Sequence, residues 1–412
     1  MSGRLAVALF SGGRGGASIA RGLLRTPGVD LTLVINGYDN GRSTGALRRY
    51  LPGMLGPSDF RKNLLVHLDG RDPRQAALRS VLEHRLPAGT TRADLADLAG
   101  LIADPPARPR DGAAREFAAL PPPAREAITR DLAAVRARFD SHPGGLDLTD
   151  CALGNLVLAG AYLRLGEDFN AAVRACARTF ETPIALLNVT NGENAYLAAL
   201  KQDGRLLADE ADIVAPQDAA AITDLFLLRE PVSAACQAEL EGRPAEEVRL
   251  ALECHRAEIS LNPAVRDAIR DADLLLYGPG TPHSSLLPSY LTPGIADAIA
   301  ESRAAAKVFV VNTRDDHDVQ GLSAPELVGR TLHYLGDPGN DRGTVTHVLS
   351  HCAPNAPHAP TVPPYLSGGG VWAGARWVTA DLEDAERPGA HCGARTVRAL
   401  TSIAGAAAPA RA

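Results

Sequence analysis

Residues 5–36 read "LAVALFSGGRGGASIARGLLRTPGVDLTLVIN" and contain several structural patterns in succession. The apolar runs 5–10 and 31–36 have the length and composition of buried parallel strands, and turn residues bound both of them. Between them, 17–26 carries apolar residues at helical spacing, directly after a run of glycines. A strand, a loop, a helix and a second strand in this order predict the beginning of a doubly wound α/β sheet.

The alternation of helices and strands returns later in the chain. Residues 264–280 and 291–314 each read as a helix followed by a strand, and 182–190 reads as a further strand. These segments predict an α/β core formed by residues 1–85 and 142–350.

Two other segments differ from this core. Residues 86–141 contain helical segments between prolines, which predicts a helical insertion rather than a flexible linker, either as a lid or as a dimerisation or packing element. Residues 351–412 are loop-rich, and we expect one strand in "ARWVTADL", a last helix and a frayed tail. The segment "HCAPNAPHAPTVPP" is expected to be irregular.

The composition excludes several classes of protein. The net charge is −6 and only 4% of the 412 residues are aromatic, which argues against nucleic-acid and polybasic membrane binding. No apolar run approaches the roughly 20 residues of a membrane helix. The six cysteines form no C-x-x-C pair, as expected for reduced thiols in the cytosol. We therefore expect a cytoplasmic homo-oligomer that binds small molecules.

The first glycine-rich loop is "SGGRGG", 11–16, between a strand and a helix. Its glycines let the backbone approach a ligand closely, and the following helix supplies free N–H groups, which together favour phosphate. The loop is neither a Walker A motif nor a clean G-x-G-x-x-G, and a tight turn without a ligand is the alternative. The candidate ligand-binding residues here are Ser11, Gly12, Gly13, Gly15 and Gly16.

A second polar loop, "DNGRSTG" at 39–45, follows the second strand, where ligands bind in open α/β sheets. It offers the side chains of Asp39, Asn40, Arg42, Ser43 and Thr44.

Soon afterwards, "GPSDFRKNLL" places Asp59, Arg61 and Asn63 at an expected helix start that Ser58 could cap. Asp59 would either complement the helix dipole or hold a metal ion or water beside a phosphate.

A third loop, "YGPGTPHSSLLP" at 277–288, again follows an apolar strand and predicts a phosphate cradle, with a capped turn as the alternative. His283 inside this loop could contact the ligand. Further on, His317 lies among Asp315, Asp316 and Asp318, and this cluster is equally consistent with a site and with a solvated loop.

Five motifs in this order resemble the CofD/YvcK family: "SGGRGG", "DNGRSTGALRRYL", "GPSDFRKNLL", "GNLVLAGAYL" and "YGPGTPHSSLLPSYLTPGIADAI". The resemblance implies a Rossmann-like three-layer α/β/α fold with a mostly parallel sheet and a nucleotide diphosphate at the strand ends. The transferases of this family use Mg²⁺ to move a phospholactyl group from a nucleotide to a deazaflavin alcohol, with release of a nucleoside monophosphate. The YvcK branch binds nucleotide sugars.

The site residues of the family are matched to residues of this chain motif by motif. "DNGRSTG" resembles the YvcK-branch pattern DDGGSSG, so Asn40 stands where that pattern has a second Asp and Arg42 where it has Gly. "SDFRKNLL" resembles GDIRNCL, and "GPGTPHSSLLP" resembles GPGSLYTSLLP. The matched residues are Asp39, Asn40, Ser43, Thr44, Asp59, Arg61, Asn155, Gly278, Gly280, Thr281, Ser284 and Ser285.

The leading hypothesis is a transferase of a phosphoryl-linked group from a nucleotide diphosphate to an acceptor alcohol. Asp39 and Asp59 would hold Mg²⁺ and water, and Arg42 and Arg61 would contact the phosphates. The alternative is a nucleotide-sugar-binding regulator with the same site and no turnover. A nicotinamide-dependent dehydrogenase is disfavoured, because no clean dinucleotide motif is present.

Overall fold

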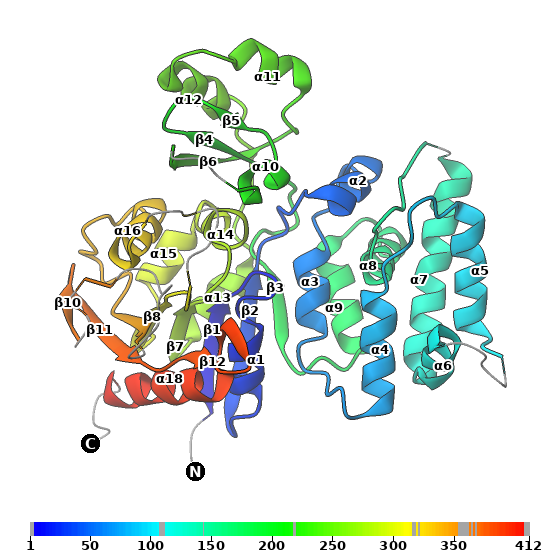
Figure 1. Ribbon diagram of the computed structural model, residues 1–412, viewed down its shortest axis with the longest axis horizontal. Helices are drawn as coiled ribbons and strands as arrows, with labels where there is room; N and C mark the ends of the chain where they lie inside the picture. The colour runs from blue at the N-terminus through cyan, green and yellow to red at the C-terminus, as the bar shows by residue number, and fades with distance from the viewer. Residues whose placement is uncertain are drawn as a thin grey trace. The chain divides into compact units, whose positions relative to one another are not determined.

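The chain divides into two units of mutually contacting residues (Figure 1). The α/β unit contains Met1–Tyr38 and Leu187–Ala412, and the helical unit contains Asp39–Leu186. The computed structural model describes residues 4–106, 112–142, 144–216, 220–314, 319, 322–352, 362–363, 366 and 369–407. The helical unit is wider than the expected insertion at 86–141, because the short helices on both sides of the insertion also belong to it.

The α/β unit is built on an eight-stranded sheet with the order β10-β11-β9-β8-β7-β1-β2-β3. The pairs β1–β2, β1–β7, β7–β8, β8–β9 and β9–β11 are parallel, and β10 is an antiparallel edge strand. The strands are β1 (Leu5–Phe10), β2 (Val29–Ile35), β3 (Ala185–Asn188), β7 (Leu274–Tyr277), β8 (Ala306–Val310), β9 (His347–His351), β10 (Gly370–Trp372) and β11 (Ala375–Ala380).

The strand order reverses direction between β1 and β7. From β1 the chain adds β2 and β3 on one side, whereas β7, β8 and β9 are added in sequence on the other side. In open α/β sheets, such a switch point creates a crevice at the carboxyl ends of the strands, where ligands bind. The topology therefore predicts a ligand site at the loops that follow β1 and β7.

Helices cover both faces of this sheet. On one face, α1 (Ala17–Leu24) and α18 (Gly393–Ala407) contact each other and the strands β2 and β8. On the other face lie α13 (Pro263–Asp271), α14 (Leu287–Tyr290), α15 (Ile295–Ala300) and α16 (Ala324–Tyr334), which share an apolar core with alternate strand residues such as Phe10 and Tyr277. The predicted three-layer α/β/α fold with a mostly parallel sheet is confirmed.

The C-terminal segment completes the sheet rather than lying apart from it. The strand expected in "ARWVTADL" is β11, and the expected last helix is α18. A short hairpin of β12 (Glu383–Asp384) and β13 (Arg387–His391) lies between them in sequence. The expected irregular segment falls mostly outside the described residues, as do the last five residues and the cluster around His317.

A three-stranded antiparallel sheet in the α/β unit was not predicted. It contains β4 (Tyr196–Lys201), β5 (Leu206–Leu207) and β6 (Ile222–Leu228), with α10 (Glu210–Val214), α11 (Ala234–Leu240) and α12 (Ala245–Glu253). Leu197 and Ala199 join the main core, whereas Ala198 and Leu200 pack with residues of α11 and α12. Because both faces of β4 are buried, its sequence lacks the alternation that marks a half-exposed strand.

The helical unit contains α2 (Arg42–Tyr50), α3 (Ser58–Leu64), α4 (Pro73–Glu83), α5 (Arg92–Ala103), α6 (Gly112–Ala119), α7 (Pro122–Ser141), α8 (Leu153–Arg164) and α9 (Phe169–Thr179). Its centre is α8, which packs closely on α7: a Cβ on Gly160 would lie 1.8 Å from the Asp131 carbonyl oxygen. The buried Asp131 carboxylate pairs with Arg164 at 2.9 Å. Among the described residues, no helix of the chain is long and apolar enough to cross a membrane.

Candidate functional site

Two glycine-rich loops leave the sheet side by side, directly after β1 and β7. Phe10 and Tyr277, the last residues of these strands, are register partners. The backbone N–H of Gly278 donates to the Phe10 carbonyl at 3.1 Å, and a Cβ on Gly278 would lie only 2.4 Å from that oxygen. A residue with a side chain cannot occupy this position without moving a strand end.

The two loops also touch each other through glycines. A Cβ on Gly15 would lie 2.6 Å from both the Gly280 Cα and the Pro279 carbonyl oxygen. A Cβ on Gly16 would lie 2.8 Å from the Ser11 hydroxyl oxygen. The predicted loop residues are therefore brought together at the switch point. Of those in the first loop, Gly15 is exposed and the others are buried: Ser11, Gly12, Gly13 and Gly16.

Two asparagines hold the loop that follows β7 in place, and sequence reasoning missed both. Asn312 follows β8 and makes two hydrogen bonds to the Gly280 backbone, accepting from its N–H and donating to its carbonyl, both at 3.0 Å. Asn36 follows β2 and donates to the Ser285 carbonyl at 2.7 Å and to the Ser289 hydroxyl at 3.1 Å. The sequence did contain a signal for both asparagines, because each is an amide residue just after a buried strand.

The remainder of the loop that follows β7 forms η1 (Pro282–Leu286), a single turn of π-helix, a form that often marks functional sites. Ser284 and His283 are buried in it, whereas Thr281 and Ser285 are half-buried. A cavity of about 20 Å³ beneath the loop is lined by His283 and Asn312, among others. It could hold no more than a water molecule, so a ligand of nucleotide size would have to lie over the loops.

In the helical unit, the backbone around Asp39 is tightly packed. The Asp39 carboxylate accepts from the Gly41 N–H at 3.0 Å, and the Asp39 carbonyl accepts from the buried Arg48 guanidinium at 3.0 Å. A Cβ on Gly56 would lie 2.4 Å from the same carbonyl oxygen. Arg48, which was not predicted, thus fixes the loop that presents Asp39.

Arg42 begins α2 with an unusual backbone conformation. Its φ is +40°, in the left-handed region that favours glycine, and its side chain is exposed. Three residues later, a Cβ on Gly45 would lie 2.1 Å from the carbonyl oxygen of the buried Asn40. Ser43 is half-buried between them. Asp150, Glu167 and Glu181 also have positive φ, so this conformation alone does not mark Arg42 as a ligand-binding residue.

A buried chain of hydrogen bonds connects three of the predicted site residues. The Thr44 hydroxyl lies 2.7 Å from the Ser58 hydroxyl, which accepts from the Asn155 amide at 3.2 Å. Asn155 in turn accepts from the Arg61 Nε at 2.9 Å. Ser58 does not cap α3, contrary to the prediction, because it is the first helical residue and Pro57 is the N-cap. Its hydroxyl is used in this network instead.

Asp59 lies in the first turn of α3, as predicted, and is 9% exposed. Burial raises its pKa above the ordinary 3.8, the Lys62 ammonium at 2.7 Å opposes this rise, and the nearby Asp39 carboxylate adds to it. Asn63 donates to the Asp59 carbonyl at 2.8 Å. Burial also lowers the pKa of the Arg61 guanidinium. Perturbed groups of this kind gather at functional sites.

The two aspartates fit Mg²⁺ only in part. Within the part of the chain that the structure describes, no three His, Cys, Asp or Glu residues form a metal-binding group. Mg²⁺ nevertheless commonly uses one or two carboxylates and takes its other ligands from water and substrate phosphates. Asp39 and Asp59 match that donor set, although Lys62 already provides one positive charge at Asp59.

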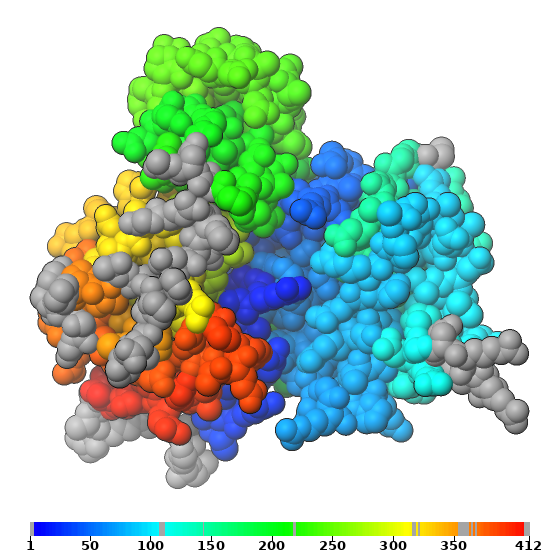
Figure 2. All heavy atoms as spheres, in the orientation of Figure 1, coloured from blue at the N-terminus to red at the C-terminus, as the bar shows by residue number. Residues whose placement is uncertain are grey.

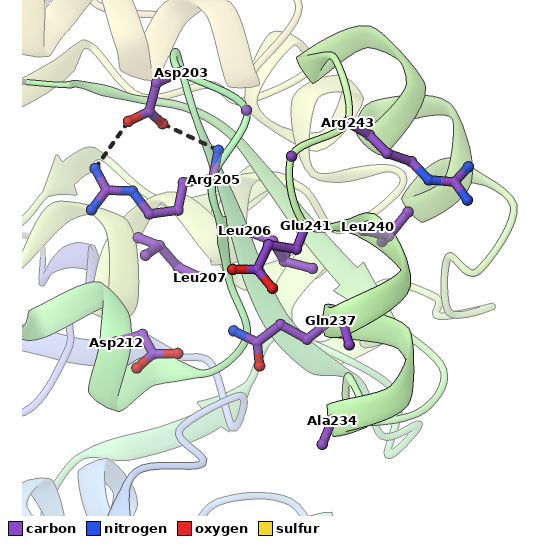
Figure 3. Close-up of a pocket in the computed structure, with 13 residues that line it drawn as sticks. Asp203, Arg205, Leu206, Leu207, Asp212, Ala234, Gln237, Leu240, Glu241 and Arg243 are labelled. Carbon is purple, nitrogen blue, oxygen red and sulfur yellow. Dashed lines mark hydrogen bonds and ion pairs between the residues drawn. The ribbon is translucent and has the colours of Figure 1, made fainter.

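A pocket of about 640 Å³ lies elsewhere in the α/β unit, between the β4–β5 turn and α11 (Figure 3). Asp203, paired with Arg205 at 3.0 Å, is on one side, and Gln237 of α11 and Glu241, the residue after this helix, point into it. None of the predicted site residues lines this pocket. The pocket lining carries both acidic and basic side chains, which favours no single class of ligand. We therefore do not place the candidate functional site in this pocket.

Comparisons with known proteins show which proteins this chain is similar to. A Bacillus subtilis protein named gluconeogenesis factor is 26% identical over 328 residues, which cover 80% of this chain and 70% of that protein. A protein of the same name from Halalkalibacterium halodurans is 25% identical over 349 residues, which cover 84% and 78%. The crystal structure of a upf0052 family member from Bacillus halodurans superimposes with a TM-score of 0.65 at 19% identity, covering 97% of this chain and 99% of that one.

A family-level match also covers most of the chain. The profile of the family described as 2-phospho-L-lactate transferase CofD matches residues 7–396, which include both glycine-rich loops and the helical unit. The resemblance seen in the motifs is thereby confirmed, and the chain belongs to the CofD family.

Proposed function

We propose that this protein binds a nucleotide diphosphate at the switch point and transfers a phosphoryl-linked group from it to an acceptor alcohol. The observation that carries the proposal is the pair of touching glycine-rich loops after β1 and β7. Glycines expose backbone N–H groups to a close ligand, and the switch point is where open α/β sheets bind nucleotides. A diphosphate would lie over 11–16 and 278–285.

In the proposed reaction, the acceptor hydroxyl oxygen attacks the phosphorus of the transferred group, and the bond from this phosphorus to the nucleoside monophosphate breaks. The hydroxyl proton passes to water. Such a reaction depends on positioning and on neutralisation of charge rather than on a nucleophilic side chain. We assign charge neutralisation to Arg42 and Arg61, and Mg²⁺ binding to Asp39 and Asp59. When bound, Mg²⁺ would withdraw charge from the phosphates.

The remaining predicted residues are proposed to hold or shape the ligand sites. Thr44, Asn155 and Arg61 are connected by hydrogen bonds, so Asn155 would orient the guanidinium of Arg61. The other residues that we propose to bind ligand are Ser11, Gly12, Gly13, Gly15, Gly16, Asn40, Ser43, Asn63, Gly278, Gly280, Thr281, Ser284 and Ser285.

A second function is supported by the relatives. Those that match along most of the chain are named gluconeogenesis factors, not transferases. In addition, Asn40 stands where the resembling pattern has an aspartate, which would weaken a Mg²⁺ site. The protein would then be a regulator that binds a nucleotide sugar at the same loops without turnover.

One experiment separates these two functions. The full chain is incubated with nucleoside diphosphate-linked donors, Mg²⁺ and acceptor alcohols, and nucleoside monophosphate is measured by mass spectrometry. A transferase releases monophosphate only when the acceptor is present. Thermal stabilisation by a nucleotide sugar, of roughly 2.7 kcal/mol at 100 times its Kd, without any monophosphate, supports the regulator. The absence of both stabilisation and turnover would contradict both functions.

A further inference from the structure

A second pocket of the α/β unit, of about 480 Å³, lies between α1 and α18, on the face of the sheet that these helices cover. Figure 2 shows the C-terminal residues in red beside the N-terminal residues in blue at this place. The residues that line the pocket include four arginines and three hydroxyl residues: Arg21, Arg25, Arg387, Arg398, Ser18, Thr26 and Thr401.

The spacing of these residues places them on facing sides of the two helices. Ser18 and Arg21 on α1 and Arg25, its C-cap, are three and four residues apart, so they lie on one side of the helix. On α18, Ala394, Arg398 and Thr401 follow the same rule. Most of the pocket is therefore formed by two facing helix surfaces, and Arg387 of β13 and Thr26, just after α1, complete its lining.

Glycines fix the distance between the two helices. A Cβ on Gly22 would lie 2.9 Å from the Gly393 carbonyl oxygen, and a Cβ on Gly393 would lie 2.2 Å from the Ser18 carbonyl oxygen. This close crossing brings the backbones together and leaves the long arginine side chains around the pocket. The close crossing therefore fixes the backbone on which the arginine side chains are carried.

The charge in this pocket is unbalanced. Its lining, as far as the described residues show, contains four arginines and no carboxylate, although the chain as a whole has a net charge of −6. Arg387 pairs with Asp384 at 2.7 Å. Arg25 and Arg398 are exposed, and among the described residues neither forms an ion pair with a carboxylate.

Helix stabilisation explains only part of this arrangement. Arg21 and Arg25 lie at the carboxyl end of α1, where positive charge favours the helix. Arg398 lies beyond the first turn of α18 and before its last turn, and Arg387 lies on β13, so neither is explained by a helix end. Arginines gathered from three elements repel one another, and a bound anion would remove that repulsion.

We propose that this pocket binds a phosphorylated small molecule through Arg25, Arg387 and Arg398. Guanidinium groups form paired hydrogen bonds to phosphate oxygens, which makes arginine the preferred residue for such ligands. The volume matches a small metabolite, since ligand pockets typically span roughly 300–1,000 Å³. The proposal does not depend on the function of the glycine-rich loops.

Isothermal titration of the full chain with inorganic pyrophosphate tests this proposal. The double variant Arg25→Gln/Arg398→Gln removes two of the charges. The matched control, Arg174→Gln/Arg178→Gln, removes two exposed arginines from α9. Because pyrophosphate could also bind at the glycine-rich loops, Gly280→Ala is titrated as well. Circular dichroism first establishes that each variant is folded.

We expect Arg25→Gln/Arg398→Gln to bind one pyrophosphate ion at least tenfold more weakly than the parent does. The control Arg174→Gln/Arg178→Gln and the variant Gly280→Ala should bind that ion with the parent's affinity. Equal affinity in the parent and the pocket variant would overturn the proposal. An equal loss in the control would also overturn it, because net charge alone would then explain binding. Binding of a short DNA duplex without any binding of pyrophosphate would show a nucleic-acid surface instead, and would equally contradict the proposal.

Discussion

At the scale of single residues, Arg42 combines backbone strain with a useful charge. Its φ of +40° costs about 1 kcal/mol for a residue with a side chain. We predict that Arg42→Gly raises the free energy of unfolding by about this amount in urea titrations and weakens nucleotide binding, because a cation is lost. Arg42→Lys, which keeps both the charge and the strain, should leave stability unchanged. A glycine variant no more stable than the parent would contradict the strain argument.

Asp59 is the residue whose ionisation the fold opposes. Because burial raises its pKa in the folded state, folding favours the protonated carboxyl, and the parent loses stability as pH rises from 3.8 to the folded pKa. Asp59→Asn removes this loss. We predict that the variant gains stability relative to the parent as pH rises through that window, measured by urea unfolding at several pH values.

The same variant should lose function while it gains stability. We expect Mg²⁺-dependent nucleotide binding to weaken about tenfold or more, because a proposed ligand of the ion is gone. Asp97→Asn, at an exposed position of α5, provides the control and should alter neither property. If Asp59→Asn binds nucleotide as the parent does at every Mg²⁺ concentration, its assignment to the metal is wrong.

At the scale of elements, the contact between α7 and α8 decides the stability of the helical unit. We predict that Gly160→Ala lowers the free energy of unfolding by about 3 kcal/mol, because its methyl group would collide with the Asp131 carbonyl oxygen. Gly100→Ala in α5 meets no atom within 4 Å and should stabilise by about 0.5–1 kcal/mol. Thermal unfolding of both variants checks the pair. Equal effects would mean that α7 and α8 are not closely packed.

The contact between α7 and α8 also means that the expected insertion at 86–141 is packed into the helical unit. The buried face of α7, which includes Ile128, Leu132 and Phe139, packs within the helical unit and against α8. Removal of 86–141 would therefore expose the centre of that unit instead of detaching a separate lid. A role in covering the ligand remains a proposal, and smaller changes confined to α5 would be the way to test it.

At the scale of the whole molecule, the sequence predicted the parallel sheet because β1, β2, β7 and β8 are short apolar runs followed by turn residues. It did not predict the sheet formed by β4, β5 and β6. β5 has only two residues, and the run of Leu and Ala in β4 is also compatible with a buried helix.

For the candidate site, sequence reasoning found the residues of the glycine-rich loops but not the residues that hold them. Asn36 and Asn312 could have been noted as amides that follow strands, but the loop residues they bind are distant in sequence. Arg48 acts through the fold of the loop around Asp39, which no local motif reveals. Similarly, the positive φ of Arg42 became visible only in the structure.

The central claim is that a nucleotide diphosphate binds at the switch point between β1 and β7. The most direct measurement is a crystal structure of the full chain grown with a nucleoside diphosphate and Mg²⁺. We predict phosphate oxygens within hydrogen-bond distance of backbone N–H groups in both 11–16 and 278–285. Phosphates bound more than a side chain's length from both loops would contradict the claim.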